Sequence, residues 1–145
     1  MATRSTIALE YADGTVDQIY CHWDGYLENN GQLLQKHWQD PFKVQKMVQL
    51  GDMSSLGEDV GVQHSFESAS TVKDCTFYGR DRNEDGTGPK RFEDFEDYKA
   101  NHQYEEYEYI LRQDGNWYVD QYGKGYTLLK DALEREQAAE ETLDA

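Results

Sequence analysis

The sequence is poor in the residues that build disulfide frameworks and membrane spans. Its two cysteines, Cys21 and Cys75, are too few for a disulfide framework, which favours a reducing cytoplasm. No run approaches the about 18 apolar residues that cross a bilayer, and the mean hydropathy of −0.95 agrees. Residues 1–10 lack the basic start and long apolar run of a signal peptide. These absences predict a cytoplasmic protein with no membrane contact.

Motifs for metal binding, nucleophilic catalysis and phosphate binding are also missing. The four histidines are scattered, and the chain has no Cys-x-x-Cys or His-x-x-x-His pair. It has no Gly-x-Ser-x-Gly segment, and Gly86-Thr87-Gly88 lacks the further glycine and the lysine–hydroxyl pair of a phosphate loop. The sequence therefore predicts no metal, no cofactor and no catalytic residue, and a binding protein in preference to an enzyme.

Basic residues are scarce: 14 Lys and Arg stand against 29 Asp and Glu, which gives a net charge of −15. Direct nucleic-acid binding is disfavoured, because phosphate contact needs clustered Lys and Arg. Aromatic residues, in contrast, make up 13% of the chain and include eleven Tyr. Disordered acidic chains are poor in aromatics, so this chain should fold, and its 145 residues suit one domain.

Two hairpins are the clearest local prediction. Strands over 4–11 and 15–23 flank Asp13-Gly14, and strands over 104–111 and 117–122 flank Asp114-Gly115. Asp-Gly between two β-rich runs is the strongest short hairpin signal. Further strands are expected near 64–66, 71–78 and 126–129.

Helices are expected at four places. One covers 32–38; a second begins at Asp40 and Pro41 and ends at Gly51. A third places Phe92, Phe95 and Tyr98 along one edge, and an Ala- and Glu-rich helix covers 131–143. Residues 52–61 and 80–90 are predicted to be loops, because glycine and small polar residues dominate them.

These elements predict a single α+β domain over residues 1–130, followed by an acidic, partly frayed C-terminal helix over 131–145. Runs of strands interrupted by separate helices favour an antiparallel sheet of about five or six strands with three or four helices. The predicted core consists of Ile7, Leu9, Ile19, Cys21, Trp23, Leu34, Met47, Val48, Cys75, Phe77, Phe95, Ile110, Trp117 and Val119.

Two short segments are candidate walls of a small-ligand pocket. At the end of the second strand, His22 and Asp24 would share one face, either as an acid–base or ligand-binding pair or as an ordinary polar turn. In the second segment, Arg80 and Arg82 could clamp a phosphate or stack on a base, or pair with neighbouring acids. The pocket hypothesis takes its residues from both segments: His22, Asp24, Tyr26, Tyr78, Arg80 and Arg82.

The densest charge lies in an acidic stretch interleaved with tyrosines. It is either a solvated face or an array of carboxylates that imitates the phosphates of a nucleic acid and occupies a basic protein surface. Tyrosine suits an interface because it adds contact area at low entropic cost. The predicted protein-binding face consists of Glu93, Asp94, Glu96, Asp97, Tyr98, Tyr104, Glu105, Glu106, Tyr107 and Glu108.

Four further segments stand out: Thr3–Ala8, Ile19–Tyr26, Leu50–Asp52 with Ser54–Gly57, and Phe77–Arg82. Together they resemble a family of small phage and prophage proteins with no assigned biochemistry. The segments His-Trp-Asp-Gly-Tyr and Tyr-Gly-Arg-Asp-Arg carry most of the resemblance, which extends to about Val119. It implies a bacterial host cytoplasm, and carries over no site residue.

The leading functional hypothesis is a non-enzymatic phage accessory protein for host takeover or anti-defence. It would bind and inhibit a host or defence protein with a basic surface, and nucleic-acid mimicry is one form that this inhibition could take. The second hypothesis is a protein that binds or sequesters a nucleotide signal through the two candidate pocket segments. A hydrolase that uses His22 and Asp24 ranks last, because the chain offers neither a nucleophile nor a metal set.

Overall fold

The computed structural model describes residues 3–67 and 73–144 of the chain. Its strands are β1 (Ser5–Glu10), β2 (Val16–Cys21), β3 (Met53–Ser55), β4 (Thr76–Phe77), β5 (Lys90–Phe92), β6 (Tyr107–Leu111), β7 (Trp117–Gln121) and β8 (Tyr126–Leu128). Its helices are α1 (Gln32–His37), α2 (Pro41–Leu50), α3 (Tyr78–Arg82), α4 (Phe95–Asn101) and α5 (Leu129–Asp144), with a single π-helical turn, η1 (Leu27–Gly31), before α1.

The strands form one open, mixed sheet in the order β4-β3-β2-β1-β6-β7-β8, and β5 pairs with β2 beside β3. The α+β class is confirmed, but an antiparallel sheet of five or six strands is wrong. The sheet has eight strands, and β1–β6 and β2–β3 are parallel pairs. Local alternation cannot reveal a pairing between segments far apart in the chain, and it cannot detect strands of two or three residues.

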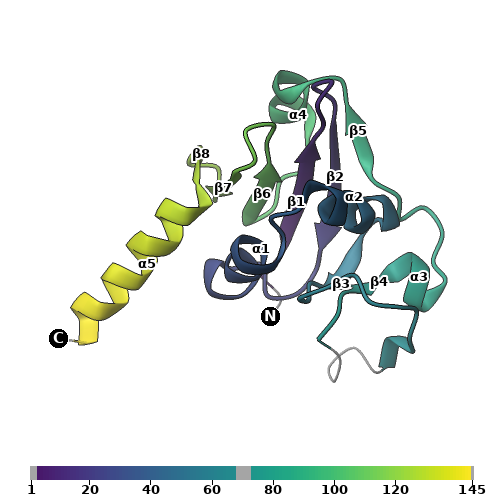
Figure 1. The fold of residues 1–145 in the computed structure, drawn as a ribbon, viewed down its shortest axis with the longest axis horizontal. Coiled ribbons are helices and arrows are strands. Elements are labelled where there is room, and N and C mark those ends of the chain that lie inside the picture. Colours follow the sequence, from purple (N-terminus) through teal and green to yellow (C-terminus); the bar gives the residue numbers. More distant parts are fainter. Residues whose placement is uncertain (1–2, 68–72, 145) are drawn as a thin grey trace.

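Both Asp-Gly hairpins are confirmed. Gly14 and Gly115 adopt φ of 92° and 80°, and the preceding aspartates accept backbone N–H bonds from Thr15 and Asn116 at 3.0 Å. Each turn follows the first strand of its hairpin, and these first strands, β1 and β6, run parallel. The two turns therefore lie at the same end of the sheet, where Figure 1 also shows α4.

The predicted limits of α2 are confirmed. The Asp40 carboxylate accepts a hydrogen bond from the Phe42 N–H at 3.0 Å, Pro41 occupies the first helical turn, and Gly51 ends the helix at φ 93°. The apolar stripe of α2 is fully buried against the sheet.

The sheet is covered on both faces. The larger cluster joins α1, α2 and α5 to one face through residues such as Leu34, Met47 and Leu129. The smaller cluster lies under α4 on the other face: Ala8, Val16, Phe92, Tyr98 and Ile110. In Figure 1, the outer part of α5 projects away from the sheet.

Most of the predicted core is confirmed, with two differences. Including Trp23 in the core is wrong, because 45% of its surface is exposed. Phe95 is only partly buried. β2 ends at Cys21 and Asp24 turns the chain at φ 57°, so the alternation that would bury Trp23 stops before it.

Four local predictions also need correction. The predicted loop over 52–61 contains β3, and the predicted loop over 80–90 begins within α3 and ends in β5. Residues 64–66 form no strand; the segment is irregular and ends in a 3₁₀ turn at 66–67. Of the strand predicted over 71–78, residues 71–72 lie outside the described residues, and the described part is a strand only at Thr76–Phe77.

Candidate functional site

The structure divides the predicted acidic face between the interior and two sides of the sheet. Tyr98 and Glu108 are buried, so including them in a binding face is wrong. Glu108 points under α4, where its carboxylate lies 2.7 Å from Nε2 of buried His102. Tyr107 is next to Glu108 in the strand and therefore faces the other side, where it stacks with Tyr109.

The other members of the predicted face have separate surroundings. Asp94 caps α4 by accepting from the Asp97 N–H at 2.8 Å, and Asp97 accepts from the Glu93 N–H at 2.9 Å. Tyr104 is 63% exposed at the far end of α4, and its ring lies against His102. Glu105 and Glu106 follow Tyr104 and are half-buried.

Five exposed carboxylates from three segments instead share one end of the sheet. The two hairpin turns supply two of them, and the start of α4 supplies three. β5 runs antiparallel to β2 with Phe92 opposite Val16, so the chain leaves β5 for α4 at this same end. We call this group the acidic end: Asp13, Glu93, Asp94, Glu96 and Asp114.

The nearby arginines are bound to carboxylates other than those of the acidic end. Arg91 donates two hydrogen bonds of 2.9 Å to buried Asp17, and Arg112 donates bonds of 3.1 and 3.3 Å to buried Glu10. Arg112 also lies 3.6 Å above the ring of Phe95. The hydrogen bonds of these arginines therefore offset buried charge, and the two cations act on Asp13 and Asp114 only at longer range.

Local hydrogen bonds keep two carboxylates of the acidic end ionised. A bond from the Thr15 hydroxyl, with its backbone N–H, lowers the pKa of Asp13, and a bond from the Tyr118 hydroxyl lowers the pKa of Asp114. One exposed cation, Lys99, lies 3.2 Å from Glu96. The acidic end thus keeps most of its negative charge at neutral pH.

The other candidate surface gathers aromatic rings where β2 meets β3 and α3. Along β2, Ile19 and Cys21 point into the larger core, so Tyr20 lies on the opposite face. Asp52, just before β3, joins β2 to α3: its carboxylate accepts a 2.9 Å bond from the Tyr20 N–H, and its carbonyl accepts a 3.2 Å bond from the Tyr78 N–H. β2 and the start of α3 are far apart in the chain, yet they place the rings of Tyr20 and Tyr78 on the same face of the sheet.

A hydrogen bond orients the histidine on this face. The Tyr20 hydroxyl lies 2.8 Å from Nδ1 of His22, and the pKa of Tyr20 is raised, mainly by burial. Tyr20 therefore keeps its proton, and its hydrogen bond with Nδ1 orients the imidazole ring of His22. Trp23 packs edge-on against His22, with 4.8 Å between the ring centroids.

Phe66 and Tyr78 stack with 5.7 Å between centroids, and the guanidinium of Arg82 lies 5.0 Å from the first ring and 5.7 Å from the second. Burial raises the pKa of Tyr78, so its hydroxyl also remains protonated. We call these five residues the aromatic cluster: Tyr20, His22, Phe66, Tyr78 and Arg82. The rings are half-buried, and the Arg82 side chain is 53% exposed.

Three residues of the predicted pocket do not contribute to the aromatic cluster. Arg80 uses its guanidinium internally: it donates to Asp81 and to the backbone carbonyls of Val60, Gly61 and Cys75. Asp24 occupies the left-handed turn, where its backbone carbonyl accepts bonds from the η1 region, and Tyr26 precedes η1. The sequence predicted that His22 pairs with Asp24; in the structure, His22 hydrogen-bonds Tyr20.

Of the aromatic cluster, the sequence predicted His22, Tyr78 and Arg82 as site residues but not Tyr20 or Phe66. The signal for Tyr20 was available, because a hydroxyl-bearing ring interrupts the apolar pattern of its strand. Phe66 gave no such signal, since its contact with Tyr78 depends on how the irregular segment over 61–67 folds back onto the sheet.

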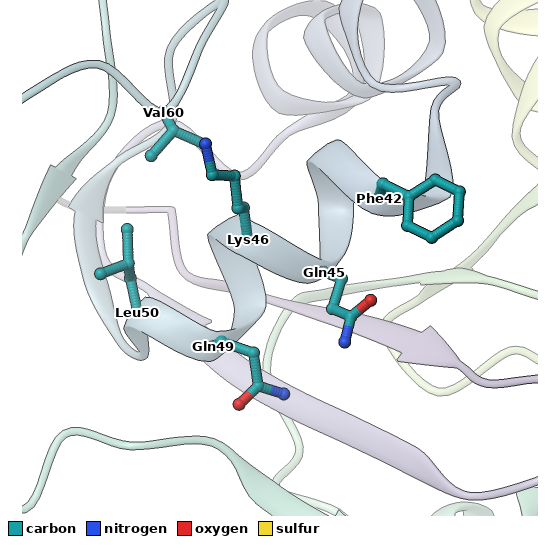
Figure 2. A pocket seen from close by; sticks show the side chains of 6 residues that line it. All are labelled: Phe42, Gln45, Lys46, Gln49, Leu50 and Val60. Carbon is teal, nitrogen blue, oxygen red and sulfur yellow. The ribbon is translucent and has the colours of Figure 1, made fainter.

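A shallow groove along α2 is a third surface feature, with a volume of about 440 Å³. Figure 2 shows Phe42 and Leu50 at its two ends, Gln45 and Gln49 along one side, and Lys46 reaching towards Val60. Phe42 is 78% exposed. The groove offers apolar contact and one cation, without a pair of groups suited to acid–base chemistry.

Both cysteines are buried and free, and burial raises the pKa of Cys21 to about 11 and that of Cys75 to about 12, so neither is a reactive thiolate. Over residues 3–67 and 73–144, no group of three His, Cys, Asp or Glu side chains is arranged to hold a metal ion. Within the same ranges, no helix combines the length and apolar character needed to cross a membrane.

Comparisons of the chain with protein-family models, curated proteins and solved structures found no match. The resemblance to phage proteins therefore stays a prediction from the sequence segments that carry it.

Proposed function

We propose that this protein binds a basic surface on a partner protein through its acidic end. The supporting observation is the distribution of charge there. Two arginines are bound to buried Asp17 and Glu10, while the carboxylates of the acidic end project from three different segments. Exposed charges of one sign, fixed to a rigid sheet end, create a field that attracts an oppositely charged surface.

The resemblance to phage proteins suggests the setting. In it, the partner is a host or defence protein in the bacterial cytoplasm, and binding inhibits it without catalysis. Carboxylates at the acidic end would occupy a surface that otherwise contacts nucleic-acid phosphates. A competition experiment distinguishes the two modes of binding. If the protein imitates nucleic acid, it should compete with nucleic acid for the partner; if it binds elsewhere on the partner, it should not.

The experiment compares two variants with equal net charge. The acidic-end variant carries Asp13→Asn, Glu93→Gln, Glu96→Gln and Asp114→Asn. Asp94 is retained because it caps α4, and Asn at the turns keeps an oxygen that can accept the turn hydrogen bonds. The control variant removes four exposed carboxylates from other elements: Glu28→Gln, Glu67→Gln, Asp85→Asn and Glu134→Gln.

Each protein is used to capture partners from bacterial lysate, and a partner held by wild type is then purified for kinetics. We expect the acidic-end variant to associate at least tenfold more slowly at low salt, with little change in dissociation, and the control variant to bind nearly like wild type. Equal losses in both variants would show that only net charge matters. No loss in either would exclude the acidic end as the binding surface.

A further inference from the structure

We propose that the aromatic cluster binds a nucleoside monophosphate, with the base against the exposed rings and the phosphate on Arg82. This site is separate from the acidic end and does not depend on the proposed function. Nucleotides combine a planar ring, which stacks on aromatic side chains, with an anion that arginine binds in two-pronged fashion.

The rings are positioned before any ligand arrives. A hydrogen bond between Tyr20 and His22 fixes the orientation of the imidazole, and Asp52 accepts hydrogen bonds from the backbone N–H groups of both Tyr20 and Tyr78. Phe66 supports the Tyr78 ring from one side with an interplanar angle of 26°. Rings that are half-buried and already oriented lose little conformational entropy when a flat ligand stacks on them.

The two arginines of this segment differ in the donors that they leave available. Arg80 directs all of its nitrogens to Asp81 and to backbone carbonyls. Arg82 forms an exposed ion pair with Glu84, with its Nε 3.2 Å from the carboxylate. The rings of Phe66 and Tyr78 lie against its guanidinium. Because this side chain is 53% exposed, it can exchange the Glu84 carboxylate for a phosphate.

The charge around the aromatic cluster is mixed. Arg82 is the cation of the cluster, Glu84 pairs with it at 3.2 Å, and the Asp52 carboxylate accepts a 2.9 Å hydrogen bond from the Tyr20 N–H. A second arginine, exposed Arg4, lowers the pKa of Tyr20 and so lies within electrostatic reach of it. Glu105 acts on Tyr20 in the opposite sense, which favours a ligand of low charge, such as a monophosphate, over a polyanion.

Trp23 provides a built-in probe. It is 45% exposed and in contact with His22, whereas Trp38 and Trp117 are buried in the core. A change in tryptophan emission on adding ligand therefore reports the aromatic cluster. The experiment titrates the full chain with AMP, GMP, CMP and UMP, and with adenosine and inorganic phosphate as separate probes. Calorimetry on the same samples measures Kd independently.

We expect at least one monophosphate to bind with a Kd below about 1 mM and to change Trp23 emission. Its nucleoside and inorganic phosphate should each bind at least tenfold more weakly. Arg82→Ala and Tyr78→Leu should each raise Kd at least tenfold. The matched controls Arg135→Ala and Tyr122→Leu replace an exposed arginine and an exposed tyrosine elsewhere, and should leave Kd unchanged.

Three results would overturn the proposal: no monophosphate binds below about 1 mM, inorganic phosphate binds as tightly as the nucleotides, or Arg82→Ala leaves Kd unchanged. Arg82 is exposed and makes no buried hydrogen bond that the structure describes, so its variant should fold and give an answer even if Tyr78→Leu does not. Partner capture by the acidic-end variant is measured in a separate experiment. A negative result for nucleotide binding therefore does not count against the proposed partner binding, and the reverse also holds.

Discussion

Arg80 and Arg82 are two residues apart and have different roles. Arg80 lies against Asp81, whose side chain is fully buried, and it ties the segment over 60–61 to Cys75. Burial by itself would raise the pKa of Asp81, but bonds from Arg80 and from the backbone N–H groups of Phe77 and His64 lower it overall. Asp81 is therefore a buried carboxylate that depends on its arginine.

This difference predicts unequal costs of truncation. Arg80→Ala leaves the Asp81 charge buried without its partner, and should lower the free energy of unfolding by about 3 kcal/mol or more. Arg82→Ala removes an exposed ion pair and a surface contact with two aromatic rings, and should change it by about 1 kcal/mol or less. Urea denaturation at pH 7 measures both. Similar costs for the two variants would contradict the assignment of Arg80 as structural.

His102 and Glu108 form a buried ion pair between α4 and β6. Nε2 and Oε1 lie 2.7 Å apart but without the alignment of a good hydrogen bond, while Nδ1 lies 2.6 Å from the Tyr98 carbonyl oxygen. The rings of Tyr98 and Tyr104 flank the imidazole. Burial lowers the pKa of His102, but the Glu108 carboxylate and the Tyr98 carbonyl raise it by more, so the net shift is upward.

A raised histidine pKa makes stability depend on pH in a defined direction. The folded protein holds a proton that the unfolded chain releases near pH 6.5, so this stabilisation is complete below that pH and is lost as pH rises through the folded pKa. We expect the free energy of unfolding to fall as the pH rises from about 6.5 through the raised pKa of His102. Glu108→Gln should lose about 3 kcal/mol at pH 6 and flatten the slope.

Denaturation at several pH values gives the slope, and NMR titration of the His102 ring gives its pKa. A His102 pKa at or below 6.5 in the folded protein would refute this assignment.

At the scale of elements, two glycines with nearly equal φ have different structural roles. Gly14, at 92°, sits in the first hairpin turn, and a Cβ there would meet nothing within 4 Å. Gly51, at 93°, ends α2, and a Cβ there would lie 2.0 Å from the Thr87 carbonyl oxygen. The same region is joined by a 2.7 Å hydrogen bond from the Asp52 N–H to that oxygen.

Alanine substitutions at Gly14 and Gly51 should therefore separate the energetic cost of backbone strain from that of a steric clash. Gly14→Ala should cost about 1 kcal/mol, the strain of a left-handed residue. Gly51→Ala adds a clash with a backbone carbonyl and should cost roughly 3 kcal/mol or more, because α2 or the segment over 87–88 must move. Thermal and urea unfolding measure both costs. Equal losses would mean that the contact between Gly51 and Thr87 is not tight.

At the scale of the whole molecule, a net charge of −15 produces repulsion that salt can screen. The buried pairs, such as Arg112 with Glu10, are less sensitive to screening than the exposed carboxylates. We expect NaCl between about 20 and 200 mM to raise stability by about 1 kcal/mol, or Tm by roughly 3 to 5 °C. The acidic-end variant should start more stable and respond less.

Thermal unfolding of wild type and both charge variants over this range tests the expectation. A Tm that falls with salt would show that attractive surface pairs outweigh repulsion. Salt should act in the opposite direction on partner binding. Added salt should slow association, because screening weakens the attraction between the two surfaces.

The sequence by itself determined the local features of this protein. Asp13-Gly14 and Asp114-Gly115 specify the hairpins because Gly reaches φ above zero and Asp bonds the turn N–H groups. Asp40, Pro41 and Gly51 specify the limits of α2 because they satisfy or replace the unpaired groups at helix ends. Charge and composition likewise follow from the sequence alone.

Tertiary structure decided how these features meet. Parallel pairing of β1 with β6 brings Asp13 and Asp114 beside the start of α4, and it directs Glu108 inward to His102. The pairing of β2 with β3 brings Tyr20 near Tyr78. The physical reason is that strand partners far apart in sequence are selected by burial of whole faces, whereas local patterns report only which side of a strand is apolar.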